Sequence, residues 1–194
     1  MRSFTTIFAA VSVLAAGVFA APEASYGKKL HQARQGACMN SRQAQRVANN
    51  YARLIRDYSD AVADRSLTED LTVYTDSVVT LINDGCESPV PLGPPFCTDR
   101  ECFKAGQGAQ PDVPFEQVNM WHTCDTVVLR WRSALTQLVT GIAVLEVVPS
   151  SAGREPYLIE NIYSEFNSAA WLVWEGVFEP VCPNTASRRS LFSV

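Results

Sequence analysis

The sequence predicts an α+β domain in which helices come first and a run of strands follows. Between residues 44 and 62, apolar residues recur at steps of three and four, which is typical of an amphipathic helix. From residue 115 to residue 166 the pattern changes to four long segments of strand type. Helices followed by strands in one short chain favour a sheet packed against helices.

The first predicted element is a long helix capped by Asn40 or Ser41. Its apolar stripe consists of residues at helical spacing: Ala44, Val47, Ala48, Tyr51, Leu54, Ile55, Tyr58 and Val62. A second, short helix is expected to begin at the capping box of residues 66–69, which reads Ser-Leu-Thr-Glu. Residues 72–76 fit a strand, residues 78–82 fit a strand or a helix, and residues 84–95, rich in Gly and Pro, predict a loop.

Another capping box, residues 98–101, predicts a helix of about two turns that stops at Gly106. In that frame Cys97 and Cys102 occupy the two positions that touch in a hydrophobic staple. The sequence therefore predicts a Cys97–Cys102 disulfide. The phrase Gly106-Gln107-Gly108 follows a helix rather than a strand, so it indicates a helix end and no dinucleotide cofactor is expected.

The four predicted strands span residues 115–122, 126–133, 139–148 and 157–166. The third is apolar on both faces, whereas an antiparallel strand usually leaves one face to solvent. We therefore expect its second face to be covered. A second copy of the chain, forming a homodimer, is one candidate, and the segment 171–178 of the same chain is the other.

The first twenty residues predict secretion. Arg2 precedes an apolar run, and Val18-Phe19-Ala20 places small residues where a signal peptidase cuts. We expect residues 1–20 to be a signal peptide, residues 21–37 a flexible lead or propeptide, and residues 183–194 a tail. The apolar run is too short for a membrane span, so no membrane association is predicted.

The composition excludes some partners. The chain has 16 Lys and Arg against 20 Asp and Glu. Removal of residues 1–20 takes away one Arg and no acid, which leaves 15 against 20 and a net charge of −5. An acidic surface of this kind argues against nucleic acid as a partner.

Six cysteines are present, and an even number in a secreted chain predicts three disulfides. Beside Cys97–Cys102, the pairing of Cys38, Cys86, Cys124 and Cys182 is open. No Cys-x-x-Cys pair occurs, and the two histidines lie far apart in the chain, so no metal site is expected.

Candidate pocket residues come from the strands and the segment before them. His122 with Asp76, Asp125 and Glu165 would form an acid–base set if the fold brings them together. The alternative, which we favour, is that His122 ends a strand beside a tight turn. Tyr163 and Glu165 share one strand face, which either lines a pocket or faces water. Tyr74 and Trp121 complete the candidate set, because aromatic rings stack on flat ligands.

Several phrases resemble a family of small secreted fungal proteins in the nuclear transport factor 2-like superfamily: NNY (49–51), DSV (76–78), FKAGQGAQP (103–111), WHTCDTV (121–127) and YSEFNSAAWLV (163–173). The resemblance covers residues 38–182. It implies a cone-shaped domain with a strongly bent antiparallel sheet around N-terminal helices and a pocket in the mouth of the cone. It also marks Cys97 and Cys102 as additions to the usual four cysteines.

Members of that superfamily include dehydratases, isomerases and cyclases that act on small apolar molecules, and also domains without catalytic activity. Fold alone does not choose between them. We expect a domain without catalytic activity that binds a small apolar molecule or another protein. The alternative is an enzyme of the dehydratase, isomerase or cyclase type that uses Asp, His or Glu in the pocket.

Overall fold

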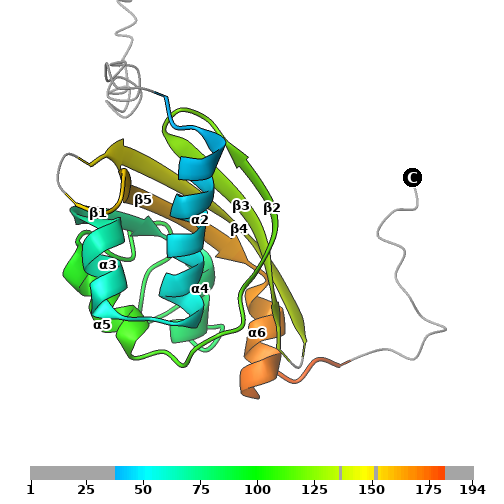
Figure 1. Ribbon diagram of the computed structural model, residues 1–194. Coiled ribbons are helices and arrows are strands. Elements are labelled where there is room, and N and C mark those ends of the chain that lie inside the picture. Colours follow the sequence, from blue (N-terminus) through cyan, green and yellow to red (C-terminus); the bar gives the residue numbers. More distant parts are fainter. Residues whose placement is uncertain (1–37, 136, 151–152, 182–194) are drawn as a thin grey trace, which may run out of the picture. The chain divides into compact units, whose positions relative to one another are not determined.

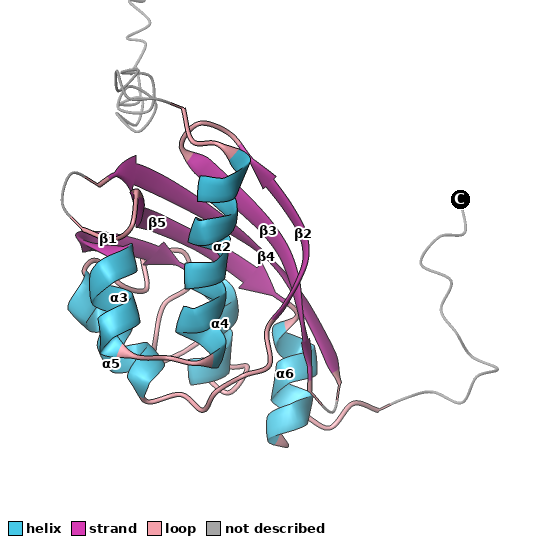
Figure 2. Cartoon of the chain, viewed as in Figure 1, coloured by secondary structure: helices cyan, strands magenta, loops and turns pink. Residues whose placement is uncertain are grey.

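Five strands form one curved sheet, and the helices lie against its concave face (Figures 1 and 2). The computed structural model describes residues 38–135, 137–150 and 153–181. Within these residues the elements in chain order are α2 (Ser41–Arg56), α3 (Asp60–Ser66), β1 (Leu67–Tyr74), α4 (Asp76–Ile82), α5 (Arg100–Gly108), β2 (Glu116–His122), β3 (Thr126–Ala134), β4 (Leu138–Pro149), β5 (Tyr157–Phe166) and α6 (Ser168–Glu175). The predicted signal peptide, lead and tail lie outside the described residues.

The strand order is β1-β5-β4-β3-β2. Strands β2 to β5 pair antiparallel, as expected, and β1 pairs parallel with β5. The predicted α+β class with a bent sheet is confirmed, with the addition of one parallel pair. The outer edge of β1 is covered by Phe96 and Cys97, whose backbone bonds to Val73.

The N-terminal helices differ from the prediction. The long helix ends at Arg56, and Val62 belongs to the separate helix α3. The prediction of a helix from the capping box at Ser66 is wrong, because Ser66 ends α3 and its hydroxyl donates to the carbonyl of Val62. Leu67, which begins β1, is fully buried and pairs with Ile159 of β5. Pairing with a distant strand therefore outweighs the local capping signal.

The three remaining helices of the described region are α4, α5 and α6, and the segment 78–82, which fitted a strand or a helix, is helical. Residues 76–82 form α4, where Thr75 caps the first turn through its hydroxyl. Asp99 rather than Thr98 caps α5, and its carboxylate accepts from the N–H of Cys102. The apolar segment around Trp171 and Trp174 forms α6, which lies on the concave side of the sheet (Figure 1). The proposal that this segment covers the other face of the sheet is therefore wrong.

The core lies between the concave face of the sheet and α2. Residues Val127, Leu129 and Trp131 on β3 alternate with exposed or half-buried neighbours, so every second side chain is buried. The same alternation holds on β4 and most of β5. This period of two gives the sheet one buried and one open face.

Two disulfides are formed in the described region. Cys97 bonds to Cys102, as predicted, and Cys38 bonds to Cys124. Because Asp99 caps α5, the two residues of the first bridge lie one position earlier in the helix frame than the predicted staple. The second bridge fixes the start of α2 to the turn between β2 and β3. Cys86 is exposed and has no partner among the described residues, and Cys182 lies outside them.

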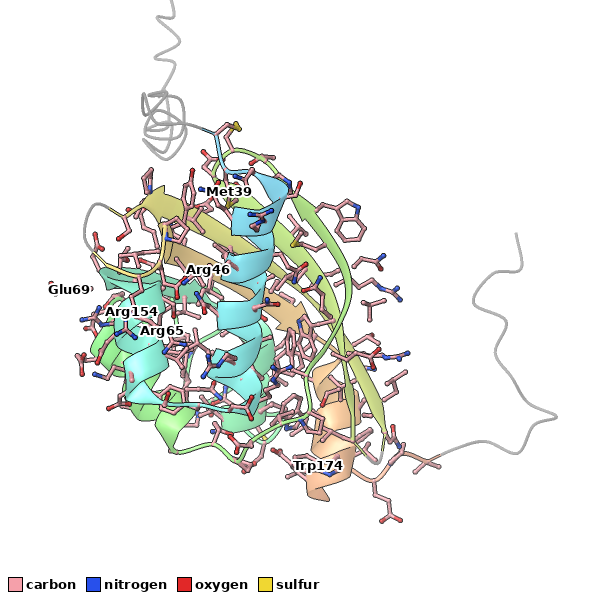
Figure 3. The ribbon with its side chains drawn as sticks, viewed as in Figure 1. Met39, Arg46, Arg65, Glu69, Arg154 and Trp174 are labelled. Atoms are coloured by element: carbon pink, nitrogen blue, oxygen red, sulfur yellow. A yellow bond between two sulfur atoms is a disulfide. The ribbon has the colours of Figure 1, made fainter. Side chains whose placement is uncertain are left out.

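A buried carboxylate holds the β4–β5 loop. Glu155 accepts from Arg46 of α2 at 2.6 Å, and Arg65 of α3 lies 3.7 Å away. Arg46 also donates to the carbonyl of Arg154. Figure 3 shows Arg46, Arg65 and Arg154 gathered where α2, α3 and this loop meet. The two guanidinium groups compensate the burial of the Glu155 carboxylate, which would otherwise be costly.

Candidate functional site

A cavity of about 270 Å³ lies between the concave face of the sheet and the helices. This is near the lower limit of about 300 Å³ for small-molecule pockets, so it suits a ligand of one or two rings. Seven aromatic and eight aliphatic or glycine residues line most of it: Tyr51, Phe96, Phe103, Phe115, Trp131, Phe166, Trp171, Ile55, Val73, Val78, Leu81, Ile82, Gly106, Val113 and Ile162. Five polar residues complete the lining: Thr75, Gln107, Gln110, Ser164 and Glu175.

Four aromatic rings form a continuous wall on the sheet side. Phe115 stacks on Trp131, Trp131 meets Phe166, and Phe166 meets Trp171, with ring centroids 5.1 to 5.7 Å apart. A glycine on β4, Gly141, makes room for this wall. A Cβ atom there would lie 2.6 Å from the ring of Trp131 and 2.7 Å from Cβ of Phe166. The wall therefore depends on the absence of a side chain at residue 141.

One buried hydroxyl pair lies in the apolar lining. The hydroxyl of Tyr51 on α2 donates to Oγ of Ser164 on β5 at 3.1 Å. Burial raises the pKa of Tyr51 to about 12, so the phenol stays protonated at neutral pH. Tyr51 is therefore a donor and not a general base. Ser164 uses its oxygen as the acceptor, which leaves its own proton to donate to a ligand oxygen.

Of the other polar lining residues, Thr75 is buried and caps α4, and the remaining three are exposed or half-buried. Glu175, at the C-terminal end of α6, is exposed and also lines the cavity, so its carboxylate lies at the mouth. Its Oε1 accepts from the indole N–H of Trp171 at 3.0 Å, which fixes its position. Gln107 and Gln110, at the end of α5 and just beyond it, lie on the same rim. Figure 3 labels Trp174, which lies one residue before Glu175 on α6.

Three of the predicted pocket residues lie on the opposite, convex face. Along one line of paired residues, Trp121 on β2, Val128 on β3, Val144 on β4, Tyr163 on β5 and Tyr74 on β1 are neighbours across the sheet. The rings of Tyr74 and Tyr163 stack 5.1 Å apart. We call this set the convex row. Paired residues project to the same face, so the convex row faces away from the cavity.

Two more of the predicted pocket residues, Asp76 and Glu165, lie at the N-terminal end of α4, where their side chains bond to backbone N–H groups. Glu165 is exposed on the convex face, and its carboxylate accepts from the backbone N–H groups of Asp76 and Ser77, both at 2.9 Å. It also accepts from the hydroxyl of Ser77. The side chain of Asp76 accepts from the N–H of Gly93 at 2.7 Å. The fold brings Asp76 and Glu165 together at the N-terminus of α4, where negative charge is favourable.

His122 lies elsewhere. Its Nε2 is 3.0 Å from the hydroxyl of Ser41 at the N-terminal end of α2, and its Nδ1 is 3.1 Å from the carbonyl of Thr123. Asp125 accepts from the hydroxyls of Thr123 and Thr126 in the same turn. The cavity instead reaches Ile55 at the C-terminal end of α2. The structure therefore does not bring His122 together with Asp76 and Glu165.

The lining residues Tyr51, Ser164, Trp131 and Glu175 are absent from the predicted site. The sequence carries only a weak signal for Ser164, a polar residue between Ile162 and Phe166, because alternation also places Glu160 on that face and the bulge in the β4–β5 pairing that separates them is not visible in the sequence. No signal separates Tyr51 or Trp131 from ordinary core residues. Within residues 38–135, 137–150 and 153–181, no group of three or more His, Cys, Asp or Glu is arranged to hold a metal ion. No helix among the same residues is long and apolar enough to cross a membrane.

The chain resembles several solved structures at low sequence identity. IdmH from Streptomyces antibioticus, a candidate polyketide cyclase, is 14% identical, with 69% of this chain and 99% of that chain covered and a TM-score of 0.49. A Catenulispora acidiphila protein with a ketosteroid isomerase-like fold, in complex with trimethylamine, is 12% identical, with 67% and 92% covered and a TM-score of 0.47. An NTF2-like protein of unknown function from Cytophaga hutchinsonii is 9% identical, with 66% and 93% covered and a TM-score of 0.45.

Among curated proteins, none has a sequence that matches the chain. The sequence model of the NTF2-like domain matches residues 37–178, which is most of the chain and includes every element described above. The chain therefore belongs to the NTF2-like domain family.

Proposed function

We propose that this protein reversibly binds a small, mainly apolar molecule in the cavity between the sheet and the helices, without converting it. The observation that carries the proposal is the lining. Seven aromatic rings surround about 270 Å³ of space, and the buried polar groups in the lining include the Tyr51–Ser164 hydroxyl pair and the indole N–H of Trp131, which has no hydrogen-bond partner among the described residues. Apolar cavities with a few oriented polar groups are typical ligand sites.

Conversion of a ligand needs a group that accepts or donates a proton near neutral pH. Among the lining residues, Tyr51 has a pKa of about 12, and Glu175 lies at the exposed mouth. His122 is bonded to Ser41, away from the lining. These positions support binding without turnover.

The test uses 1-tetralone and tetralin, which differ by one carbonyl oxygen. Both are expected to bind in isothermal titration calorimetry, and 1-tetralone should bind more tightly because Ser164 donates to its carbonyl. The variant Ser164→Ala should weaken 1-tetralone about threefold to tenfold, in line with one hydrogen bond, and leave tetralin nearly unchanged. Recovery of unchanged 1-tetralone after incubation is expected; a protein-dependent product would contradict binding without turnover.

A second variant locates the binding. Val78 on α4 lines the cavity, and Thr80 on the same helix does not. Val78→Phe should fill the cavity and abolish tetralin binding, and Thr80→Phe should leave it intact. Equal loss, or equal retention, in both variants would show that the ligand binds elsewhere.

We also propose a homodimer through the convex face. Residues Arg130, Ile142 and Glu165 are paired neighbours on β3, β4 and β5, so a cation and an anion flank an apolar centre. A twofold axis through Ile142, which is 43% exposed, would place each Arg130 opposite the partner's Glu165. The convex row would add apolar contact beside it.

Light scattering at tens of micromolar should give twice the mass of one chain for the native sequence. Ile142→Asp should give a single-chain mass, and Leu92→Asp, an exposed apolar residue in the loop before α5, should leave the dimer intact. A single-chain mass for the native protein would contradict the dimer.

We further propose that the protein is secreted and carries a third disulfide, Cys86–Cys182. The two bridges in the described region use four of the six cysteines. Cys86 follows Gly85, where a Cβ would lie 3.2 Å from Leu172 of α6, and Cys182 comes soon after α6 in the chain. Peptide mapping of the secreted protein without reduction should give a Cys86–Cys182 peptide and an N-terminus at Ala21. A free thiol at Cys86 would contradict the third bridge.

A further inference from the structure

Several residues that line the cavity lie at the C-terminal ends of helices. Ile55 lies in the last turn of α2, Ile82 ends α4, Gln107 lies in the last turn of α5, and Glu175 ends α6; all four residues line the cavity. In Figure 1, α2 and α6 run toward the same end of the molecule. The C-terminal end of a helix carries a partial negative charge of about half an elementary charge. Such ends favour positive charge beside them, and those of α4, α5 and α6 have no basic residue in the last turn.

The charged side chain of the lining adds to this preference for positive charge. Glu175 is the one lining residue with a charged side chain; the twenty lining residues include no Lys, Arg or His. The basic residues near these helix ends lie outside the lining. Arg53, in the last turn of α2, is exposed. Arg56 pairs with Asp57 at 2.9 Å, and Lys104 of α5 bonds to Asp64 and Glu101, both at 3.1 Å. An anion entering the cavity would meet no positive partner in its lining.

The aromatic wall also favours positive charge. Phe115, Trp131, Phe166 and Trp171 are inclined to their neighbours by 23°, 57° and 44°, so the wall is curved rather than flat. Ring faces attract ammonium groups that lie within about 6 Å of the ring centroid. The rings and the mouth therefore select the same sign of charge.

We propose that the cavity selects a small apolar molecule that carries one positively charged nitrogen, a tertiary or quaternary amine, with the charge directed toward Glu175. The inference rests on the proposed binding function and assigns the chemical class of its ligand. The apolar part lies along Phe115, Trp131 and Phe166. The cationic group lies at the mouth beside Glu175 and the ring of Trp171, which bonds to Glu175. Anions of the same shape are excluded.

Three probes of similar shape test the charge: phenyltrimethylammonium, tert-butylbenzene and benzenesulfonate, which are cationic, neutral and anionic. By calorimetry we expect phenyltrimethylammonium to bind at least as tightly as tert-butylbenzene, and benzenesulfonate to show no binding at millimolar concentration. If tert-butylbenzene binds more than tenfold more tightly than the cation, or if benzenesulfonate binds, the charge selection is wrong and the binding function stands. If none of the three binds, the binding function fails as well.

A variant pair tests the role of Glu175. Glu175→Gln keeps an oxygen that accepts from Trp171 and removes the charge. It should weaken phenyltrimethylammonium about twofold to fivefold, as expected for a partly exposed ion pair, and leave tert-butylbenzene unchanged. Glu179→Gln, four residues further along and outside the lining, is the matched control and should change neither affinity. An equal change for both probes in Glu175→Gln would assign Glu175 a structural role and overturn the proposal.

Discussion

The two faces of the sheet are built from the same strands and have opposite characters. On β5, Ile162, Ser164 and Phe166 line the cavity, and Tyr163 and Glu165, between them in sequence, lie on the convex face. The concave face is covered by the helices and carries few polar groups. Tyr51 and Ser164 bond to each other there, whereas the buried indole N–H of Trp131 has no hydrogen-bond partner among the described residues. The convex face combines apolar, aromatic and charged side chains without a covering element among the described residues.

The two faces of the sheet are therefore suited to different kinds of binding partner. The concave face has the shape and chemistry to enclose a small molecule, and its residues constrain one another closely. The convex face is open and fits a second surface. Substitutions at neighbouring strand positions therefore have different consequences, which the following measurements compare.

The largest difference is expected on β4. Gly141→Val places methyl groups where Trp131 and Phe166 already lie, and overpacking of this kind costs about 3 kcal/mol. Thr140→Val, one residue earlier and exposed on the other face, should change the free energy of unfolding by less than about 0.5 kcal/mol. Urea denaturation of both variants measures the difference. Similar stabilities would mean that the aromatic wall is not closely packed.

On the convex face, substitution of Glu165 is expected to lower the free energy of unfolding more than substitution of other exposed residues. Glu165→Ala removes the acceptor of two backbone N–H groups and one hydroxyl at the start of α4, so we expect a loss of about 2 kcal/mol. Glu165→Gln keeps one acceptor oxygen and should recover about half of that loss. Calorimetric unfolding distinguishes this from an acid–base role. No loss of stability in Glu165→Ala would contradict the anchoring role.

Tyr51 gives the concave face a dependence on alkaline pH. Its folded pKa of about 12 lies above the ordinary value of about 10, so as pH rises above 10 the unfolded chain ionises first. The free energy of unfolding therefore falls as pH rises, by about 1 kcal/mol between pH 9 and pH 11 from this residue.

Tyr51→Phe should remove that part of the fall. Tyr58, whose pKa is raised by burial and by its hydrogen bond to Asp60, retains its own contribution in the variant. Denaturation at the two pH values gives the comparison. An unchanged pH dependence in Tyr51→Phe would show that the phenol is accessible to solvent.

The smallest effect concerns the stacked pair of the convex row. Tyr74→Leu and Tyr163→Leu, alone and combined in a double-mutant cycle, should give a coupling of about 0.5 kcal/mol in the single chain. The cycle is measured in the Ile142→Asp background, so that association does not contribute. A coupling near zero would mean that the two rings add no stability beyond their separate packing.

Sequence patterns predict the strands well and the site poorly, for a physical reason. The period-two pattern of a strand indicates which side chains share a face of the sheet. The predicted bounds of β5 are the observed ones. The pattern does not indicate which face of the sheet becomes concave, because that depends on which face the helices pack against. Tyr163 and Glu165 are therefore predicted pocket candidates, whereas their neighbours in sequence, Ser164 and Phe166, line the pocket. At Ser66, a local capping signal concealed a strand that only distant pairing stabilises.

The parallel pairing of β1 with β5 has a consequence for the order in which the chain folds. Strand β1 ends at Tyr74, and the strand it pairs with begins at Tyr157. During synthesis, more than eighty further residues must therefore be added after β1 before the strand with which it pairs is present. Contacts that span so much of the chain slow folding and leave a strand with unpaired edges exposed in the nascent protein. A ribosome-bound chain ending before residue 157 should therefore be highly sensitive to protease, because its first strand has no sheet to join.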